Sequence, residues 1–197
     1  DTADNNIKLP ESYPFSYQST LHITNSKGVQ EVIYFLEPEQ NYYARKQNES
    51  SYSEHVVFDN ARNIEVYFAE IDGKKRRAVK RMDIIGKVKQ IGAFRDSPNT
   101  KITAIGSKSV LGFECKGYKI TSDAGTTELW ITNQAPATAF RALFEARAAM
   151  PNSPFTKDTM IMEVVYTSAD NSNNNYRMTC MEFKPSQQQF LINNYTE

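Results

Sequence analysis

The sequence predicts a mainly β domain: a strongly curved antiparallel meander sheet, or half-barrel, covered by one main helix over about residues 136–150. Three observations support this prediction. Short segments of alternating polar and apolar residues recur along the chain and are separated by tight turn signals. Connections this short can join only antiparallel neighbours. One segment with helical spacing follows these strands, and its apolar stripe needs a sheet to cover.

The clearest local signal is the dipeptide Asp72-Gly73 between two extended segments. Gly supplies the positive φ that a two-residue hairpin turn needs, and such a turn fixes the register of its strands. The paired residues are Ile71 with Lys74, Glu70 with Lys75, Val66 with Val79, and Glu65 with Lys80. Opposite charges and apolar side chains thus face each other, and each such pair contributes a few tenths of a kcal/mol.

Further turn signals at residues 25–28 and 123–125 help to divide the chain into roughly nine to eleven strands. The predicted helix begins at Pro136 and ends before Pro151. Its stripe consists of Phe140, Leu143, Phe144 and Arg147, at positions i, i+3, i+4 and i+7. A shorter helix is predicted over residues 83–92.

The length of 197 residues fits one large domain. We expect this domain to span residues 13–187. A polar, poorly ordered segment (residues 1–12) precedes it, and a Gln-rich tail that is extended or frayed (residues 188–197) follows. The chain begins without Met and without an apolar signal-type segment, which fits either a mature exported protein or a truncated one.

The composition excludes several classes of protein. Hydrophobic residues make up 40% of the chain, with 11 Phe and 11 Tyr, which is enough to build a core. The 23 basic and 23 acidic residues balance, whereas nucleic-acid-binding proteins usually have a basic excess. No apolar run approaches the ~18 residues that indicate a transmembrane segment. We therefore expect no nucleic-acid partner and no membrane span.

The residue pattern shows no recognisable catalytic or metal motif. The only histidines, His22 and His55, lie in predicted strands, and no serine has the surroundings of a nucleophile elbow. Zinc-type spacing and a glycine-rich phosphate loop are both absent. We therefore predict a protein that is not an enzyme and has no metal or cofactor. The sequence leaves open whether Cys115 and Cys180 form a disulfide or stay as buried thiols.

The abundant aromatic residues allow two interpretations. The concave face of a curved sheet under one helix can enclose an apolar pocket for an acyl chain or a similar ligand. It can equally be filled as an ordinary packed core. The residues predicted to line such a pocket are Leu21, Ile23, Val66, Phe68, Val79, Trp130, Phe140, Leu143 and Phe144.

Residues 74–81 form the densest basic run of the chain. Glutamates across the hairpin account for Lys75 and Lys80. Arg77 and Arg81 lie on the same strand face as Val66 and Phe68, where we predict contact with an anionic lipid headgroup or an acidic partner. The alternative is a solvated strand whose arginines extend to the rim of the apolar face.

Two neighbouring segments resemble a known family. Residues 112–120 (GFECKGYKI) contain a G-x-x-C-x-x-Y strand, and residues 123–132 (DAGTTELWIT) contain a T-x-E-x-W-x-T strand after a short turn. Both resemble an uncharacterised family of exported bacterial proteins, known only as a domain of unknown function. That family is similar in fold to the periplasmic lipoprotein carriers of the LolA and LppX type, whose curved, unclosed sheet covers an apolar cavity. The resemblance implies an envelope or periplasmic location and carriage of a lipid or lipoprotein acyl chain, and it supplies no catalytic residues.

Two functions follow from these observations. The first is a non-enzymatic periplasmic or envelope-associated protein that binds a lipid, acyl chain or other apolar ligand in the concave face of its sheet. The second is a structural or protein-interaction module that presents its edge strands, or the basic run at residues 74–81, to an envelope protein and holds no internal ligand.

Overall fold

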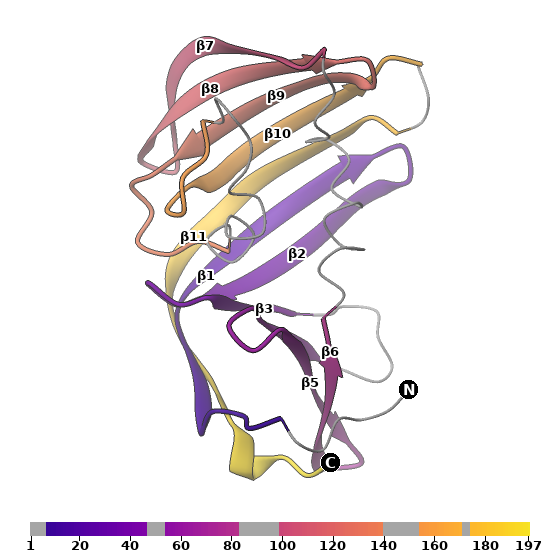
Figure 1. The fold of residues 1–197 in the computed structure, drawn as a ribbon, viewed down its shortest axis with the longest axis vertical. Coiled ribbons are helices and arrows are strands. Elements are labelled where there is room, and N and C mark those ends of the chain that lie inside the picture. The colour runs from indigo at the N-terminus through magenta and orange to yellow at the C-terminus, as the bar shows by residue number, and fades with distance from the viewer. Residues whose placement is uncertain (1–6, 47–53, 83–98, 140–153, 171–173) are drawn as a thin grey trace.

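The structure, a computed structural model, describes residues 7–46, 54–82, 99–139, 154–170 and 174–197. Within these ranges the chain forms one antiparallel sheet of 11 strands, in the spatial order β6-β5-β4-β3-β2-β1-β11-β10-β9-β8-β7 (Figure 1). The strands are β1 (Ser12–Asn25), β2 (Gly28–Leu36), β3 (Tyr42–Lys46), β4 (His55–Asp59), β5 (Ile64–Ile71), β6 (Lys74–Arg81), β7 (Lys101–Val110), β8 (Phe113–Ser122), β9 (Gly125–Thr132), β10 (Met160–Ser168) and β11 (Tyr176–Leu191). The prediction of a mainly β, antiparallel meander is confirmed.

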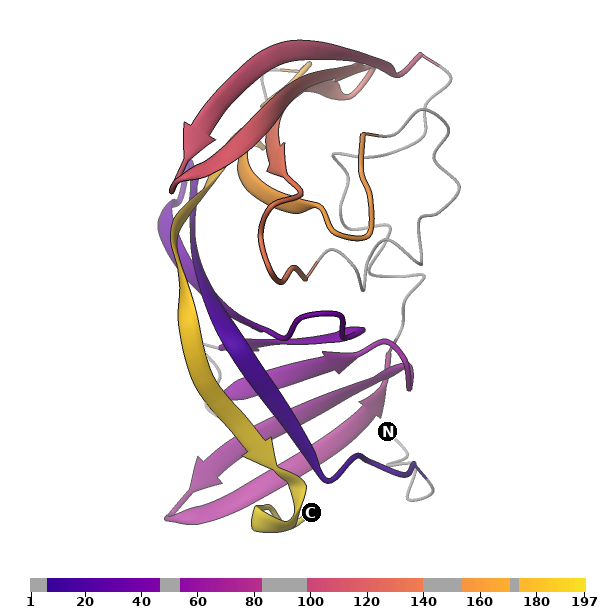
Figure 2. The same cartoon turned by 90° about the vertical axis from the view of Figure 1, so that its left-hand side faces the viewer.

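Two long strands at the centre of the sheet join two meanders. β1 has 14 residues and β11 has 16, and they pair along their whole length. Their register shifts between Phe15 and Tyr17 and between Thr20 and Leu21, and β-bulges of this kind bend strands. Strands β2 to β6 extend the sheet from β1, and β10 to β7 extend it from β11. The result is a strongly curved, unclosed sheet that bends around the loops at residues 133–139 and 154–159 (Figure 2).

The β5–β6 hairpin has the register that its turn predicts. Asp72 and Gly73 have φ angles of 52° and 71°, as a two-residue turn with left-handed residues requires. Ile71 pairs with Lys74, and Val66 pairs with Val79. The glutamates also face their predicted lysines, in the pairs Glu70–Lys75 and Glu65–Lys80.

Apolar side chains gather in separate clusters on the sheet. The first cluster packs β2 to β5 against the ends of β1 and β11, and it contains Tyr13, Phe15, Phe35, Ala44, Val57, Ile64, Val66, Phe68, Phe190 and Ile192. The second lies over β8 to β10 and contains Ile120, Leu129, Ile131, Phe155 and Val164. The third contains Leu21, Cys115, Met160, Met162 and Cys180. The strands are therefore held by several packed cores rather than by one.

The structure does not show the covering helix that the sequence predicts over about residues 136–150. Residues 136–139 are not helical, and residues 140–150 lie outside the described residues, as do Phe140, Leu143 and Phe144. The Thr138 hydroxyl donates a hydrogen bond of 2.7 Å to the Thr159 carbonyl, which ties this segment to the opposite end of the same connection. The shorter helix predicted over residues 83–92 also falls outside the described residues.

Both ends of the described chain contribute to the first cluster. Ile7 and Leu9, in the segment expected to be poorly ordered, pack against it, and β1 begins at Ser12. Residues 188–191, which the sequence assigned to a tail, continue strand β11. Phe190 explains this extension, because its ring is only 2% exposed and stacks on Phe68 at 4.6 Å between centroids.

Candidate functional site

A pocket of about 480 Å³ lies where β8 begins and β9 ends, beside the connection from β9 to β10. Its size falls within the range of about 300–1,000 Å³ that is typical of small-molecule sites. The lining residues are Glu114, Lys116, Tyr118, Ile131, Thr132, Asn133, Gln134 and Pro154.

The β8–β9 hairpin supplies one wall of this pocket. Lys116 pairs with Ile131, and Tyr118 pairs with Leu129, so these four side chains share one face of the sheet. Leu129 is fully buried below them, in the second cluster. Phe155, which follows the lining residue Pro154, packs into the same cluster. The pocket therefore stands directly on a packed core.

Hydrogen bonds fix the opposite, polar wall. The Asn133 side-chain carbonyl accepts a 2.8 Å hydrogen bond from the hydroxyl of Thr159, which is fully buried. The same hydroxyl accepts a 2.8 Å hydrogen bond from the backbone N–H of Thr156. The side-chain carbonyl of Gln134 accepts the backbone N–H of Glu114 at 3.1 Å, which links the loop to β8. Hydrogen bonds within the chain thus hold the polar wall in place.

The chemistry of the lining is divided. Tyr118, Ile131 and Pro154 offer apolar surface, whereas Lys116 and Glu114 are exposed residues of opposite charge. Sites that combine an apolar wall with a few fixed polar groups orient ligands that have both kinds of surface. The pocket accordingly suits an amphipathic molecule better than a purely apolar one.

The pocket is lined by other residues than those predicted. Val66 and Phe68 are buried in the first cluster, and Val79 packs against it. Leu21 belongs to the third cluster, Trp130 packs against that cluster, and Ile23 is half-buried on β1. Five of these six residues thus divide between two separate clusters, and Ile23 belongs to neither of them. The other three, Phe140, Leu143 and Phe144, lie outside the described residues.

Trp130 has a structural role next to the pocket. Successive side chains of a strand point to opposite faces, so Trp130 faces away from the pocket that Ile131 lines. Its ring covers Gly117 so closely that a Cβ atom there would lie 2.6 Å from it. The Lys108 ammonium stands 4.4 Å above the ring and forms an ion pair with Glu163. The Trp and Gly of the two motif strands therefore pack against each other.

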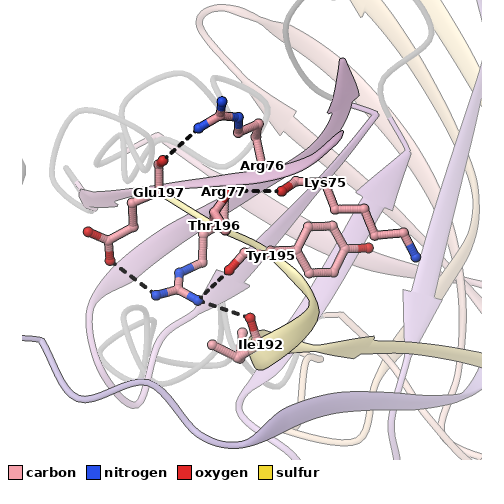
Figure 3. Close-up of polar contacts among 7 residues, drawn as sticks. All are labelled: Lys75, Arg76, Arg77, Ile192, Tyr195, Thr196 and Glu197. Atoms are coloured by element: carbon pink, nitrogen blue, oxygen red, sulfur yellow. Dashed lines mark hydrogen bonds and ion pairs between the residues drawn. The ribbon is translucent and has the colours of Figure 1, made fainter. Parts of the chain in front are cut away.

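The basic run at residues 74–81 forms strand β6, and its central arginine binds a segment of the same chain (Figure 3). The Arg77 guanidinium donates hydrogen bonds to the carbonyls of Ile192 at 2.9 Å and Tyr195 at 3.0 Å. It also forms an ion pair of 3.1 Å with Glu197. Arg81 lies opposite Ile64 and is exposed. The Arg77 guanidinium is thus engaged within the chain.

Residues 17–188 match the family model described as "Domain of unknown function (DUF4412)". The chain belongs to this family. The match contains both strands, β8 and β9, that carry the resemblance in the sequence, and it includes every residue that lines the pocket. No curated protein matches the chain.

Several solved structures are similar to this chain over most of its length, at low sequence identity. PNGF-II in the P21 space group has 10% identity and a TM-score of 0.47; the match covers 93% of this chain and 30% of that one. The MucA/MucB complex of Pseudomonas aeruginosa has 9% identity and a TM-score of 0.45; the match covers 92% of this chain and 56% of that one. The LolA superfamily protein NE2245 from Nitrosomonas europaea has 8% identity and a TM-score of 0.29, with 93% and 90% covered. This chain spans less than a third of PNGF-II.

Neither histidine lies in the pocket. His22 has a carboxylate neighbour, Glu31, at 3.4 Å, but both side chains are exposed on a surface hairpin. Cys115 and Cys180 are buried free thiols rather than a disulfide. Among the described residues, no group of three or more His, Cys, Asp or Glu side chains has a geometry that holds a metal ion. In the same part of the chain, no helix combines the length and apolar character needed to cross a bilayer.

His55 makes folding sensitive to pH. Its ring lies between Phe190 at 5.1 Å and Phe35 at 5.7 Å. Burial, with a smaller effect of Lys46, lowers the pKa of His55 from 6.5 to about 4. The unfolded chain therefore binds more protons than the folded one between these two values. Stability is full above pH 6.5 and falls as the pH decreases towards 4.

We expect the free energy of unfolding to fall by at most about 3 kcal/mol across this interval because of His55. Replacing it with Phe keeps an aromatic ring in the cluster and removes the titrating group. Urea unfolding at pH 7 and pH 4 measures the effect in both proteins, and the other titrating groups cancel in the comparison. An equal pH dependence in the wild type and His55→Phe would contradict the assignment.

Proposed function

We propose that this protein is a non-enzymatic binding protein of the cell envelope that holds an amphipathic ligand in the pocket between β8, β9 and the β9–β10 connection. The acyl chain, or another apolar part of the ligand, lies against Tyr118, Ile131 and Pro154. Its polar or anionic head lies at the rim, next to Lys116. The fixed, two-sided lining of the pocket is the observation that carries this proposal.

The surroundings of the pocket support a binding role. The polar wall is anchored by Thr159 and Glu114, so no rearrangement is needed before a ligand enters. A site that is formed in advance loses less conformational entropy on binding. A lipid and a lipoprotein acyl chain both have the required apolar and polar parts.

Location and catalysis belong to the same proposal. We place the protein in the periplasm or at the envelope, where exported proteins meet lipids and lipoproteins. MucB in complex with MucA and a LolA superfamily protein are among the solved structures that are similar to this chain. Neither histidine is among the residues that line the pocket.

Reversing the charge of Lys116 is expected to weaken binding of a fatty acid about tenfold, because the rim would then repel the carboxylate. The measurement is titration of the purified protein with cis-parinaric acid, followed by fluorescence. Lipid extraction and mass spectrometry of the natively purified protein would identify the molecule that it carries.

The matched control is Lys119→Glu. Lys119 is an exposed lysine three residues further along β8, on the opposite face of the sheet. Its replacement by Glu changes the net charge by the same amount as Lys116→Glu. This variant should bind the fatty acid as the wild type does. No binding by the wild type, or equal losses in the two variants, would show that the pocket does not hold the ligand.

A further inference from the structure

The exposed edge of β6 is already used for strand pairing. β6 is the last strand on its side of the sheet, and an edge strand presents unpaired N–H and C=O groups along one side. Thr196 forms a parallel bridge with Arg76 at this edge. The backbone N–H of Arg77 donates to the Thr196 carbonyl at 2.8 Å, and the backbone N–H of Thr196 donates to the Lys75 carbonyl at 3.1 Å.

The segment that occupies the edge follows directly after strand β11 and the first cluster, to which Phe190 and Ile192 belong. Strand β11 ends at Leu191, and the 3-10 turn η3 (Ile192–Asn194) carries the chain across to β6. Figure 3 shows residues 195–197 alongside β6, with the Tyr195 carbonyl and the Glu197 carboxylate turned towards the Arg77 guanidinium. The contact is therefore a short extended segment laid on an edge strand, and not a continuation of the central sheet.

Two side chains of this segment contact residues of β6 and of its neighbour β5. The Tyr195 ring lies 4.8 Å from the Phe68 ring and 5.7 Å from the Lys75 ammonium. Two positions later, the Glu197 carboxylate pairs with Arg77 at 3.1 Å. Backbone pairing supplies general affinity for an extended chain, and side-chain sites of this type supply selectivity.

Residues 195–197 leave one hydrogen-bond donor of the Arg77 guanidinium without a partner. The Nε atom of Arg77 is buried and has no hydrogen-bond partner, whereas both terminal nitrogens are engaged. A guanidinium binds a carboxylate best in the bidentate, two-bond geometry. An acidic side chain that also accepted a hydrogen bond from Nε would satisfy this donor. Residues 195–197 therefore do not use all the hydrogen-bonding groups of the site. Lys74 and Arg76 are exposed beside it and also favour an acidic partner.

We propose that the edge of β6 is a binding site for an extended segment of a partner protein, with an aromatic residue two positions before an acidic one. Residues 195–197 of this chain occupy the site as an internal competitor. The partner adds a parallel strand to β6, places its ring between Phe68 and Lys75, and gives its carboxylate to Arg77. This partner site is separate from the ligand pocket at β8 and β9.

The test uses a fluorescein-labelled peptide with blocked ends and the sequence Leu-Ile-Asn-Asn-Tyr-Thr-Glu, which is residues 191–197. Fluorescence anisotropy measures its binding to the full chain and to Thr196→Pro. Proline has no N–H to donate to Lys75, so this substitution weakens the internal competitor. We expect the variant to bind the peptide about tenfold more tightly than the wild type, because the site is free for a larger fraction of the time.

Two controls separate specific recognition from attraction by charge. Adding Arg77→Ala to Thr196→Pro should abolish the gain, whereas adding Arg81→Ala on the same strand should leave it intact. A peptide with Gln in place of the Glu should bind at least tenfold more weakly. If Thr196→Pro fails to fold by circular dichroism, Tyr195→Ala frees the site without changing the backbone. Equal binding by wild type and released variants, or equal losses from Arg77→Ala and Arg81→Ala, would overturn the proposal.

Discussion

Replacing Gly125 by Ala is expected to lower the free energy of unfolding by roughly 3–5 kcal/mol, because two costs add at this position. Gly125 begins β9 with a φ of 145°, a conformation that residues with a Cβ rarely adopt. A Cβ would also lie 2.2 Å from the Thr167 carbonyl oxygen of the adjacent strand β10. Since that neighbour is backbone, the strand itself has to move. Urea unfolding, followed by circular dichroism, measures the loss.

Gly28→Ala provides the matched control. Gly28 also lies in a hairpin, with a φ of 125°, but a Cβ there would meet no atom within 4 Å. This variant is expected to lose only the backbone term, about 1–3 kcal/mol. The difference between the two variants isolates the contact with β10. Equal losses in the two variants would mean that strand β10 can move away from the new Cβ without a loss of free energy.

Much of the strand pattern can be predicted from the sequence, because short turns fix registers. The dipeptide Asp72-Gly73 determines the whole β5–β6 pairing, which the structure reproduces residue by residue. The extension of β11 could not be predicted in the same way. Its residues 187–189 are three consecutive glutamines, so polar side chains hide the alternation that Phe190 completes. Only the contact of Phe190 with the distant Phe68 explains why the strand continues.

The sequence predicts the candidate site less well than it predicts the strands. The turn at residues 123–124 pairs Lys116 with Ile131, and that register alone assigns Ile131 and Trp130 to opposite faces. It does not say which face is covered by the β9–β10 connection. That choice depends on long-range contacts, such as the hydrogen bond from Thr159 to Asn133. The role of Arg77 was hidden for the same reason, since its partners lie more than 110 positions away in the chain.

The second large effect concerns Asp59, a fully buried carboxylate at the end of β4. It accepts hydrogen bonds from the Tyr13 hydroxyl at 2.9 Å and from the Arg62 backbone N–H at 3.0 Å. The Arg62 guanidinium donates a further bond of 2.9 Å. Burial, followed by the neighbouring charge of Asp59, raises the pKa of Tyr13, so the phenol remains a donor over the whole accessible pH range. One carboxylate thus ties the β4–β5 turn to the start of β1.

Asp59→Ala is expected to cost about 3 kcal/mol, because it removes charge-assisted hydrogen bonds and leaves a buried hydroxyl without its acceptor. Tyr13→Phe removes the donor instead, and the carboxylate keeps Arg62 as a partner, so this variant should lose about 1 kcal/mol. In the double variant no orphaned hydroxyl remains. Its loss should therefore be smaller than the sum of the two single losses, as interacting residues in a double-mutant cycle require. Additive losses in urea unfolding would show that Tyr13 and Asp59 stabilise the fold independently, and that the turn and β1 are joined by apolar packing alone.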